Sequence, residues 1–257
     1  MLLQTKDLIE QSTADLLQRR KTIAVRPGMA LIWVGDDPQT KSFVRVKQQK
    51  AKLLDCDFYL YHLETATFDQ LVALMKSLNK KKEVHGIVLQ LPLPDKSWVA
   101  PLIDAMSPEK DIDHLRSDSP YQAPTPAGIL SIIKHNQIDP AKEQTVILGA
   151  GRLVGAPLAE IFAQNNWPFS QIRRKAADHQ DEIKKATLVI SGTGVEKLIT
   201  ADYVGTNAVV VDGSGIDVDI ASVEPAARAV SPSKGAVGPM TVCQLFENLL
   251  ISSSRVV

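Results

Sequence analysis

The chain repeats one local pattern, in which a short apolar run of strand length is followed by a longer stretch with apolar residues at helical spacing. Parallel strands need a crossover connection, which is usually a helix. The alternation therefore predicts an α/β fold, with parallel sheets that are covered by helices on both faces. The predicted strands are residues 29–34, 58–63, 84–91, 145–148, 187–191 and 208–212, and the predicted helices are residues 5–20, 40–54, 68–78, 127–135 and 154–163.

Residues 111–126 interrupt this alternation with serine, aspartate and proline, which are typical of an ordered loop or linker. The same pattern resumes after them, so we place a domain boundary in this segment and predict two α/β domains. The last predicted helix, residues 241–252, has an apolar face that must pack against another part of the protein.

Composition excludes several classes of protein. The 257 residues contain 29 Lys plus Arg and 29 Asp plus Glu, and this balance favours neither nucleic acid nor a membrane as a partner. Two cysteines far apart in the chain favour a reduced, cytoplasmic protein over a disulfide framework. We expect no secretion signal, because the first residues never form the apolar segment that a signal peptide requires. We expect no membrane span, because no apolar run approaches the ~20 residues that cross a bilayer. We also expect no metal site.

A glycine-rich turn follows the predicted strand at residues 145–148. Gly149, Gly151 and Gly155 lie between this strand and the next predicted helix, where backbone N–H groups can bind a pyrophosphate. The spacing is one residue longer than the usual dinucleotide fingerprint, and a glycine turn that serves packing alone is the alternative. The order of strand, glycines and helix favours a Rossmann-like domain that binds NAD(P).

The choice between NAD and NADP rests on a basic triplet. About 20 residues beyond such glycines, an NAD site places an acidic residue on the ribose, whereas this chain has Arg173, Arg174 and Lys175. Guanidinium groups bind phosphate in a bidentate manner, so the triplet favours the 2′-phosphate of NADP over a solvated run of charges. Another predicted strand ends within residues 211–216. Flexible residues follow it there, at an edge of the sheet where cofactors commonly lie.

The first half of the chain offers three candidate side chains. Phe43 and Lys47 are four residues apart and therefore share one face of a predicted helix. Gln90 lies at the end of a predicted strand, on the edge of the sheet where ligands bind. Taken singly, Lys47 is more often a solvated lysine and Gln90 more often an amide that satisfies a loop.

With several further motifs, these residues resemble the bifunctional methylenetetrahydrofolate dehydrogenase/cyclohydrolase family, FolD, and the chain is identified as a divergent member. The likeness extends over nearly the whole chain. Its most specific segments are residues 34–38 (VGDDP), 86–94 (GIVLQLPLP), 149–157 (GAGRLVGAP) and 237–241 (VGPMT).

The resemblance implies two domains with a cleft between them: residues 1–125 plus 241–257 for folate and catalysis, and residues 126–240 for NADP. It implies NADP-dependent oxidation of 5,10-methylenetetrahydrofolate to 5,10-methenyltetrahydrofolate, and hydrolysis of that cation to 10-formyltetrahydrofolate. It further implies a place in one-carbon metabolism and purine biosynthesis, with tetrahydrofolate derivatives as ligands and a homodimer as the assembly.

The resemblance also implies the site residues. Lys47, Gln90 and Asp113 match catalytic positions, and Phe43 and Pro239 join them in binding the substrate. The cofactor-binding positions are Gly149, Ala150, Gly151, Arg174 and Ile216. On this reading a neutral Lys47 relays protons and Gln90 holds its amine in position. Asp113 accepts hydrogen bonds from the pterin ring, and a loop cap is the other interpretation of this aspartate.

Departures from the family pattern modify these expectations. Phe43 replaces a tyrosine, so its ring can stack on folate but the hydroxyl is lost, which predicts impaired cyclohydrolase activity. His114 replaces a glycine, which predicts a side chain beside the pterin pocket and a backbone barred from positive φ. Lys234 lies in a changed segment, where it either repels the methenyl cation or points to solvent. Gly151 lacks a hydroxyl that binds phosphate, a loss of about 0.5–1.5 kcal/mol.

Two other functions stay open at this point. A degenerate paralogue would bind folate or nucleotide without turnover. A different dehydrogenase would use the same two-domain plan on another small substrate.

Overall fold

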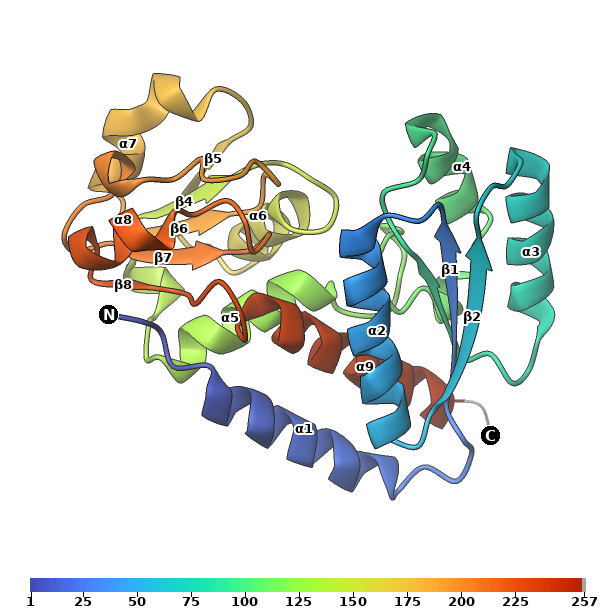
Figure 1. The fold of residues 1–257 in the computed structure, drawn as a ribbon. Coiled ribbons are helices and arrows are strands. Elements are labelled where there is room, and N and C mark those ends of the chain that lie inside the picture. The colour runs from blue at the N-terminus through green and yellow to red at the C-terminus, as the bar shows by residue number, and fades with distance from the viewer. Residues whose placement is uncertain (256–257) are drawn as a thin grey trace. The chain divides into compact units, whose positions relative to one another are not determined.

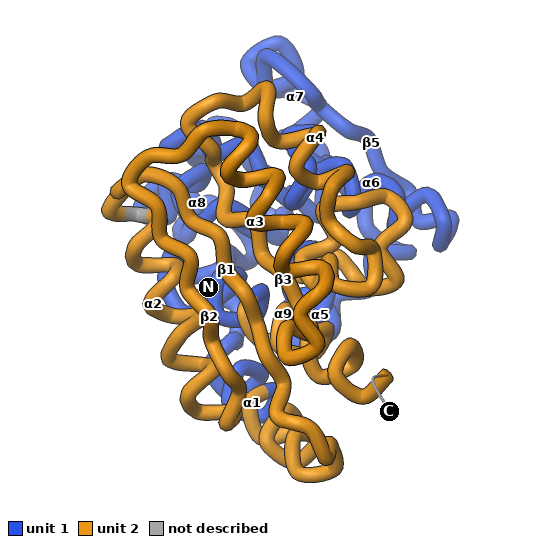
Figure 2. Tube along the Cα trace, turned by 90° about the vertical axis from the view of Figure 1, so that its right-hand side faces the viewer, with its two compact units in different colours: residues 1–12, 125–241 blue, residues 13–124, 242–257 orange. Residues whose placement is uncertain are grey.

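A computed structural model describes residues 1–255 of the chain, which divides into two compact units. Unit 1 comprises residues 1–12 and 125–241, and unit 2 comprises residues 13–124 together with the described residues from 242 onward (Figure 2). Each unit contains its own parallel sheet, as the alternation of strands and helices predicts.

Unit 2 has a three-stranded sheet in the order β2–β1–β3, formed by β1 (Gly28–Val34), β2 (Asp57–Leu63) and β3 (Gly86–Leu89); β1 and β2 are labelled in Figure 1, and all three strands are labelled in Figure 2. Met29 on β1 is paired with Phe58 on one side and with Gly86 on the other, and both pairings are parallel. The associated helices are α1 (Lys6–Arg20), α2 (Pro38–Leu53), α3 (Phe68–Lys80), α4 (Val99–Asp104) and α9 (Val237–Ser254), of which α1 and α9 each begin in unit 1.

Alternate side chains of β1 enter two separate cores. Met29 and Leu31 pack with residues of α2 and of the C-terminal part of α9. Ala30 and Ile32 pack with residues of α3 and α4 on the opposite face. The apolar face of the last helix is therefore buried in unit 2, where Phe246 is fully enclosed.

Unit 1 has a five-stranded sheet in the order β5–β4–β6–β7–β8, and every pairing in it is parallel. Residues of α5 and α6 pack on one face and residues of α7 and α8 on the other, which makes the sheet doubly wound. The elements are β4 (Thr145–Leu148), β5 (Phe169–Ile172), β6 (Leu188–Ser191), β7 (Val209–Asp212), β8 (Ala229–Val230), α5 (Pro124–His135), α6 (Gly155–Gln164), α7 (Gln180–Lys185) and α8 (Ile220–Ala226).

Unit 1 contains four elements that the sequence analysis did not predict, namely β5, α7, α8 and β8. The sequence analysis missed β5, because this edge strand is only four residues long, includes two polar side chains and buries only Ile172. Residues 1–12 group with unit 1 in the structure: Leu3 N–H donates to the carbonyl of Val230 at 2.9 Å, and the Leu3 side chain is buried. Pairing with the short strand β8 thus draws the start of the chain to this unit.

The length and hydropathy of the helices are relevant to the expectation that the chain has no membrane span. Among residues 1–255, no helix combines the length and the apolar character that crossing a bilayer requires.

Candidate functional site

The turn between β1 and α2 determines where the first candidate residues lie. Gly35 ends the strand with φ +93°, a conformation that favours glycine. The Asp37 side chain then caps α2 by accepting a hydrogen bond from Thr40 N–H at 2.6 Å, and Pro38 occupies the first turn of the helix. Phe43 and Lys47 follow on α2, one helical turn apart.

Lys47 and Gln90 are in direct contact. Lys47 Nζ donates a hydrogen bond to Gln90 Oε1 at 2.8 Å, and Gln90 Nε2 donates to the carbonyl of Leu91 at 3.0 Å. Gln90 directly follows β3 and therefore lies at the carboxyl edge of the sheet, whereas Lys47 lies on α2, the helix that follows the neighbouring parallel strand β1. In open α/β sheets this edge is where ligands bind.

The electrostatics of this pair favour an uncharged amine. Burial lowers the pKa of Lys47, and the negative charge of Asp113 opposes that shift. Burial raises the pKa of Asp113, and the charges of Lys47 and His114 oppose it. Lys47, Gln90 and Asp113, which the sequence analysis singled out separately, therefore belong to one cluster in unit 2.

Asp111 and Asp113 have different surroundings. The Asp111 carboxylate is fully buried and accepts hydrogen bonds from the N–H groups of Leu115 at 3.0 Å and Arg116 at 2.8 Å. Asp111 is therefore the cap of this loop, the alternative role considered for Asp113. Among residues 1–255, no protein group donates a hydrogen bond to the Asp113 carboxylate, so it has acceptor capacity left for a ligand.

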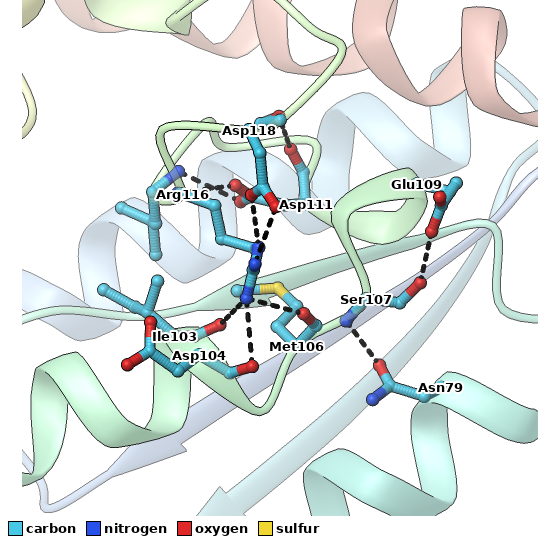
Figure 3. A network of polar contacts seen from close by, with 11 residues as sticks. Asn79, Ile103, Asp104, Met106, Ser107, Glu109, Asp111, Arg116 and Asp118 are labelled. Carbon is cyan, nitrogen blue, oxygen red and sulfur yellow. Dashed lines mark hydrogen bonds and ion pairs between the residues drawn. The ribbon is translucent and has the colours of Figure 1, made fainter.

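Further contacts hold the loop that contains Asp113. Arg116 donates to the backbone carbonyls of Ile103, Asp104 and Met106 and forms a bidentate ion pair with Asp118 (Figure 3). On the other side, Asn248 of α9 donates to the carbonyls of Ile112 and Gln122, both at 2.8 Å. The sequence analysis missed both residues: the contacts of Asn248 span more than a hundred residues and leave no local signal, and no motif marked Arg116.

His114 contradicts one of our expectations. The residue adopts φ +53°, although a side chain at this position was predicted to bar positive φ. The loop enforces this conformation, because His114 N–H donates to the Asp111 carbonyl at 3.2 Å while the next two N–H groups bond to the Asp111 carboxylate. Histidine is among the residues that tolerate this region better than β-branched ones do.

The three glycines in the turn between β4 and α6 have three different roles. Gly149 turns the chain with φ +96°. A Cβ on Gly155 would lie 2.2 Å from the Gly149 carbonyl oxygen, so this glycine permits close packing of α6 on the turn. A Cβ on Gly151 would meet no atom nearer than 3.9 Å, so packing does not require glycine there. Gly151 and the exposed Ala150 leave open backbone that a pyrophosphate can approach.

Gln171 on β5 holds the glycine turn in place. Its Nε2 donates to the carbonyls of Gly149 and Gly155, both at 3.0 Å. The sequence analysis missed this residue together with its strand. Arg173 and Arg174 directly follow β5 and are exposed, so the basic triplet begins at the carboxyl end of the strand that neighbours β4.

A buried carboxylate joins the loops that follow β6 and β7. Asp217 is fully buried and accepts hydrogen bonds from Ser191 Oγ at 2.5 Å, from both Thr193 N–H at 2.7 Å and Thr193 Oγ1 at 2.8 Å, and from Ser214 Oγ. Ile216, a predicted cofactor contact, precedes it and is 38% exposed. The sequence contained no motif that marked Asp217.

The remaining predicted positions lie near the start of α9. Pro239 is partly exposed in the first turn of this helix and belongs to unit 1. Lys234 is exposed in the segment before it, which agrees with the solvent-facing alternative. Within the described part of the chain, no group of three or more His, Cys, Asp or Glu side chains is arranged to hold a metal ion.

Comparisons with known proteins agree with this arrangement. Residues 3–113 match the catalytic domain of the tetrahydrofolate dehydrogenase/cyclohydrolase family, and residues 123–257 match its NAD(P)-binding domain. The chain is 31% identical over 264 residues to the bifunctional protein FolD of Bacillus licheniformis, with 95% of this chain and 93% of that protein covered. It is 34% identical over 254 residues to the bifunctional protein FolD of Parasynechococcus marenigrum, with 91% and 87% covered.

Solved structures give the same result. The crystal structure of the bifunctional methylenetetrahydrofolate dehydrogenase/cyclohydrolase FolD from Campylobacter jejuni superposes with a TM-score of 0.90 at 28% identity. The match covers 100% of this chain and 99% of that one.

Proposed function

The chain belongs to the tetrahydrofolate dehydrogenase/cyclohydrolase family, and on that premise we propose that it oxidises 5,10-methylenetetrahydrofolate with NADP and hydrolyses the resulting methenyl cation to 10-formyltetrahydrofolate. We assign folate binding to unit 2 and NADP binding to unit 1. The observation that carries the proposal is the hydrogen bond from Lys47 Nζ to Gln90 Oε1, next to a carboxylate without a protein donor at Asp113.

Lys47 is the proton-transfer group in this proposal. Loss of hydride leaves a positive charge on the folate, which a neighbouring ammonium would oppose. Because burial lowers the pKa of Lys47, its amine can be neutral and can accept the proton that water loses on attacking the cation. Gln90 accepts one N–H of the amine and thereby orients the nitrogen lone pair. The net reaction releases one proton to solvent.

Asp113 recognises the substrate. The amino-pyrimidinone edge of a pterin presents N–H donors, and a carboxylate is an acceptor-only group that matches them. The proposed role follows from the free acceptor capacity of Asp113 and from its position beside Lys47. We place Phe43 and Pro239 in contact with the rest of the substrate; Phe43 is 43% exposed, as a stacking surface requires.

Unit 1 fits NADP. The open backbone at Ala150 and Gly151 suits the pyrophosphate, and Arg174 beyond β5 suits the 2′-phosphate. We place Gly149 and Ile216 at the same cofactor. When bound, NADP supplies the hydride acceptor, and the protein contributes binding and orientation.

Phe43 limits the second reaction. A tyrosine hydroxyl at this position would give the hydrolysis an additional proton donor and acceptor, which phenylalanine lacks. We therefore propose that cyclohydrolase activity is impaired relative to dehydrogenase activity.

The assembly and cellular role are also proposals. β2 is an edge strand that pairs with β1 alone among the described strands, so its outer N–H and C=O groups are free to pair with a second copy in a homodimer. We assign the activity to the cytoplasm and to one-carbon metabolism, where 10-formyltetrahydrofolate serves purine biosynthesis. Sedimentation of the wild type and a Leu60→Lys variant tests the dimer, because Leu60 on β2 is 39% exposed.

Absorbance of NADPH tests the enzyme proposal. Purified protein with methylenetetrahydrofolate and NADP should form NADPH, Lys47→Met should lose the activity, and Lys50→Met should keep it. Lys50 is the matched control, because it lies on the same helix and its amine donates to Thr13 Oγ1 at 2.8 Å. Wild-type rates no higher than those of Lys47→Met would refute the proposal. Tight binding without turnover in calorimetry would instead select the degenerate paralogue.

A further inference from the structure

His114 combines two unfavourable features at one residue. Its backbone has φ +53°, which costs free energy in any residue with a Cβ. Its Nδ1 is buried without a hydrogen-bond partner, and an unsatisfied buried polar atom is also unfavourable. Such features persist when the surrounding structure enforces them, and they cluster at binding sites. Here the enforcing contacts are the hydrogen bonds to Asp111.

The ring lies next to the substrate-recognising carboxylate. The charged form of His114 lowers the pKa of both Asp113 and Asp111, so the imidazole is within direct electrostatic range of the two carboxylates. His114 as a whole is partly exposed, whereas Nδ1 is enclosed. The accessible edge of the ring is therefore the edge that contains Nε2.

The surroundings also favour one tautomer of the ring. A neutral imidazole has one N–H donor and one acceptor nitrogen. A buried N–H without an acceptor is rarer in proteins than an acceptor without a donor. The proton is accordingly expected on Nε2, and the accessible edge of His114 presents a hydrogen-bond donor.

We propose that His114 is a specificity-determining residue, whose Nε2–H donates to the 4-oxo group of the pterin while Asp113 accepts from the neighbouring ring N–H. This inference rests on the proposed function and names how its substrate is selected. On a pterin ring the 4-oxo acceptor and the N3–H donor are adjacent, and the chain presents a donor and an acceptor on consecutive residues. A ring with an amino group at position 4 would place a donor against the His114 donor.

Calorimetry with tetrahydrofolate and with its 4-amino-4-deoxy analogue tests this proposal. The wild type should prefer the 4-oxo compound, and His114→Gly should reduce that preference by roughly threefold to tenfold, the value of one hydrogen bond. His114→Gln, which keeps an N–H donor, should retain part of the preference. The ratio of the two dissociation constants is the decisive quantity, because a loss of general stability would weaken both ligands alike.

Gln137→Gly is the matched control, because Gln137 also has positive φ, +59°, is exposed and lies in unit 1. It should leave the preference unchanged. An unchanged preference in His114→Gly would overturn the proposal, as would equal losses in His114→Gly and His114→Gln. Wild-type protein without affinity for either folate would instead contradict the proposed function, so the two failures are distinguishable.

Discussion

Alanine substitution at two glycines of the same turn should affect different properties: stability at Gly155 and NADP affinity at Gly151. A Cβ on Gly155 would lie 2.2 Å from the Gly149 carbonyl oxygen, whereas ordinary contact begins at 3.4 Å. The backbone must therefore open by 3.4 − 2.2 = 1.2 Å. Overpacking of this kind costs about 1–3 kcal/mol, and Gly155 is the first residue of α6, so improved helix propensity offsets little of it.

Gly151→Ala introduces no such clash. The nearest atom to the new Cβ is 3.9 Å away, so stability should change by no more than about 0.5 kcal/mol. The methyl group nevertheless occupies the space through which a pyrophosphate would approach the backbone. We expect the dissociation constant for NADP to rise at least tenfold, which corresponds to about 1.4 kcal/mol.

Urea unfolding and calorimetry with NADP separate the two effects. Gly155→Ala should lower the unfolding midpoint, and Gly151→Ala should keep the midpoint but lose affinity. NADP affinity equal to that of the wild type in Gly151→Ala would refute the assignment of this turn to the pyrophosphate. A Gly155→Ala variant as stable as the wild type would refute the packing argument.

Three further predictions concern unit 2. Phe43→Tyr should raise hydrolysis of the methenyl compound at least tenfold, a threshold set below the roughly 10²–10⁴-fold range of general acid–base effects, with little change in NADPH formation; equal rates of hydrolysis would show that this position does not limit the reaction. Burial, followed by the charge of Lys110, lowers the pKa of His85, whose Nδ1 accepts Gly28 N–H at 3.0 Å, so the unfolded chain binds the proton more readily. Stability should therefore fall as pH drops below about 6.5, and urea midpoints of His85→Asn should show a smaller fall. Asp111→Asn should cost about 1–3 kcal/mol in urea unfolding, because the two backbone N–H groups bind different carboxylate oxygens and the amide would place an NH2 donor against one of them.

The sequence predicts well whatever depends on local pattern. Buried strands such as β4 and the capped start of α2 are encoded within a few residues, and their positions agree with the structure to within two residues. The edge strand β5 was missed, because an edge strand lacks the continuous apolar run that marks a central one. The contact between Lys47 and Gln90 joins residues 43 positions apart, so only the fold or the family resemblance could indicate it. The expected cleft between the domains stays a prediction.

The two aspartates at 111 and 113 show why site residues need more than a motif. Both lie in the same short loop, and the sequence offered a loop cap and a ligand acceptor as the two uses of such an aspartate. Burial and hydrogen bonding separate them: Asp111 binds two backbone N–H groups, and Asp113 binds none among the described residues. The same hydrogen bonds that occupy Asp111 also hold His114 at positive φ beside Asp113. One aspartate therefore builds the loop so that its neighbour stays available to a ligand, and substitution of each should affect a different measurement, stability for Asp111 and folate affinity for Asp113.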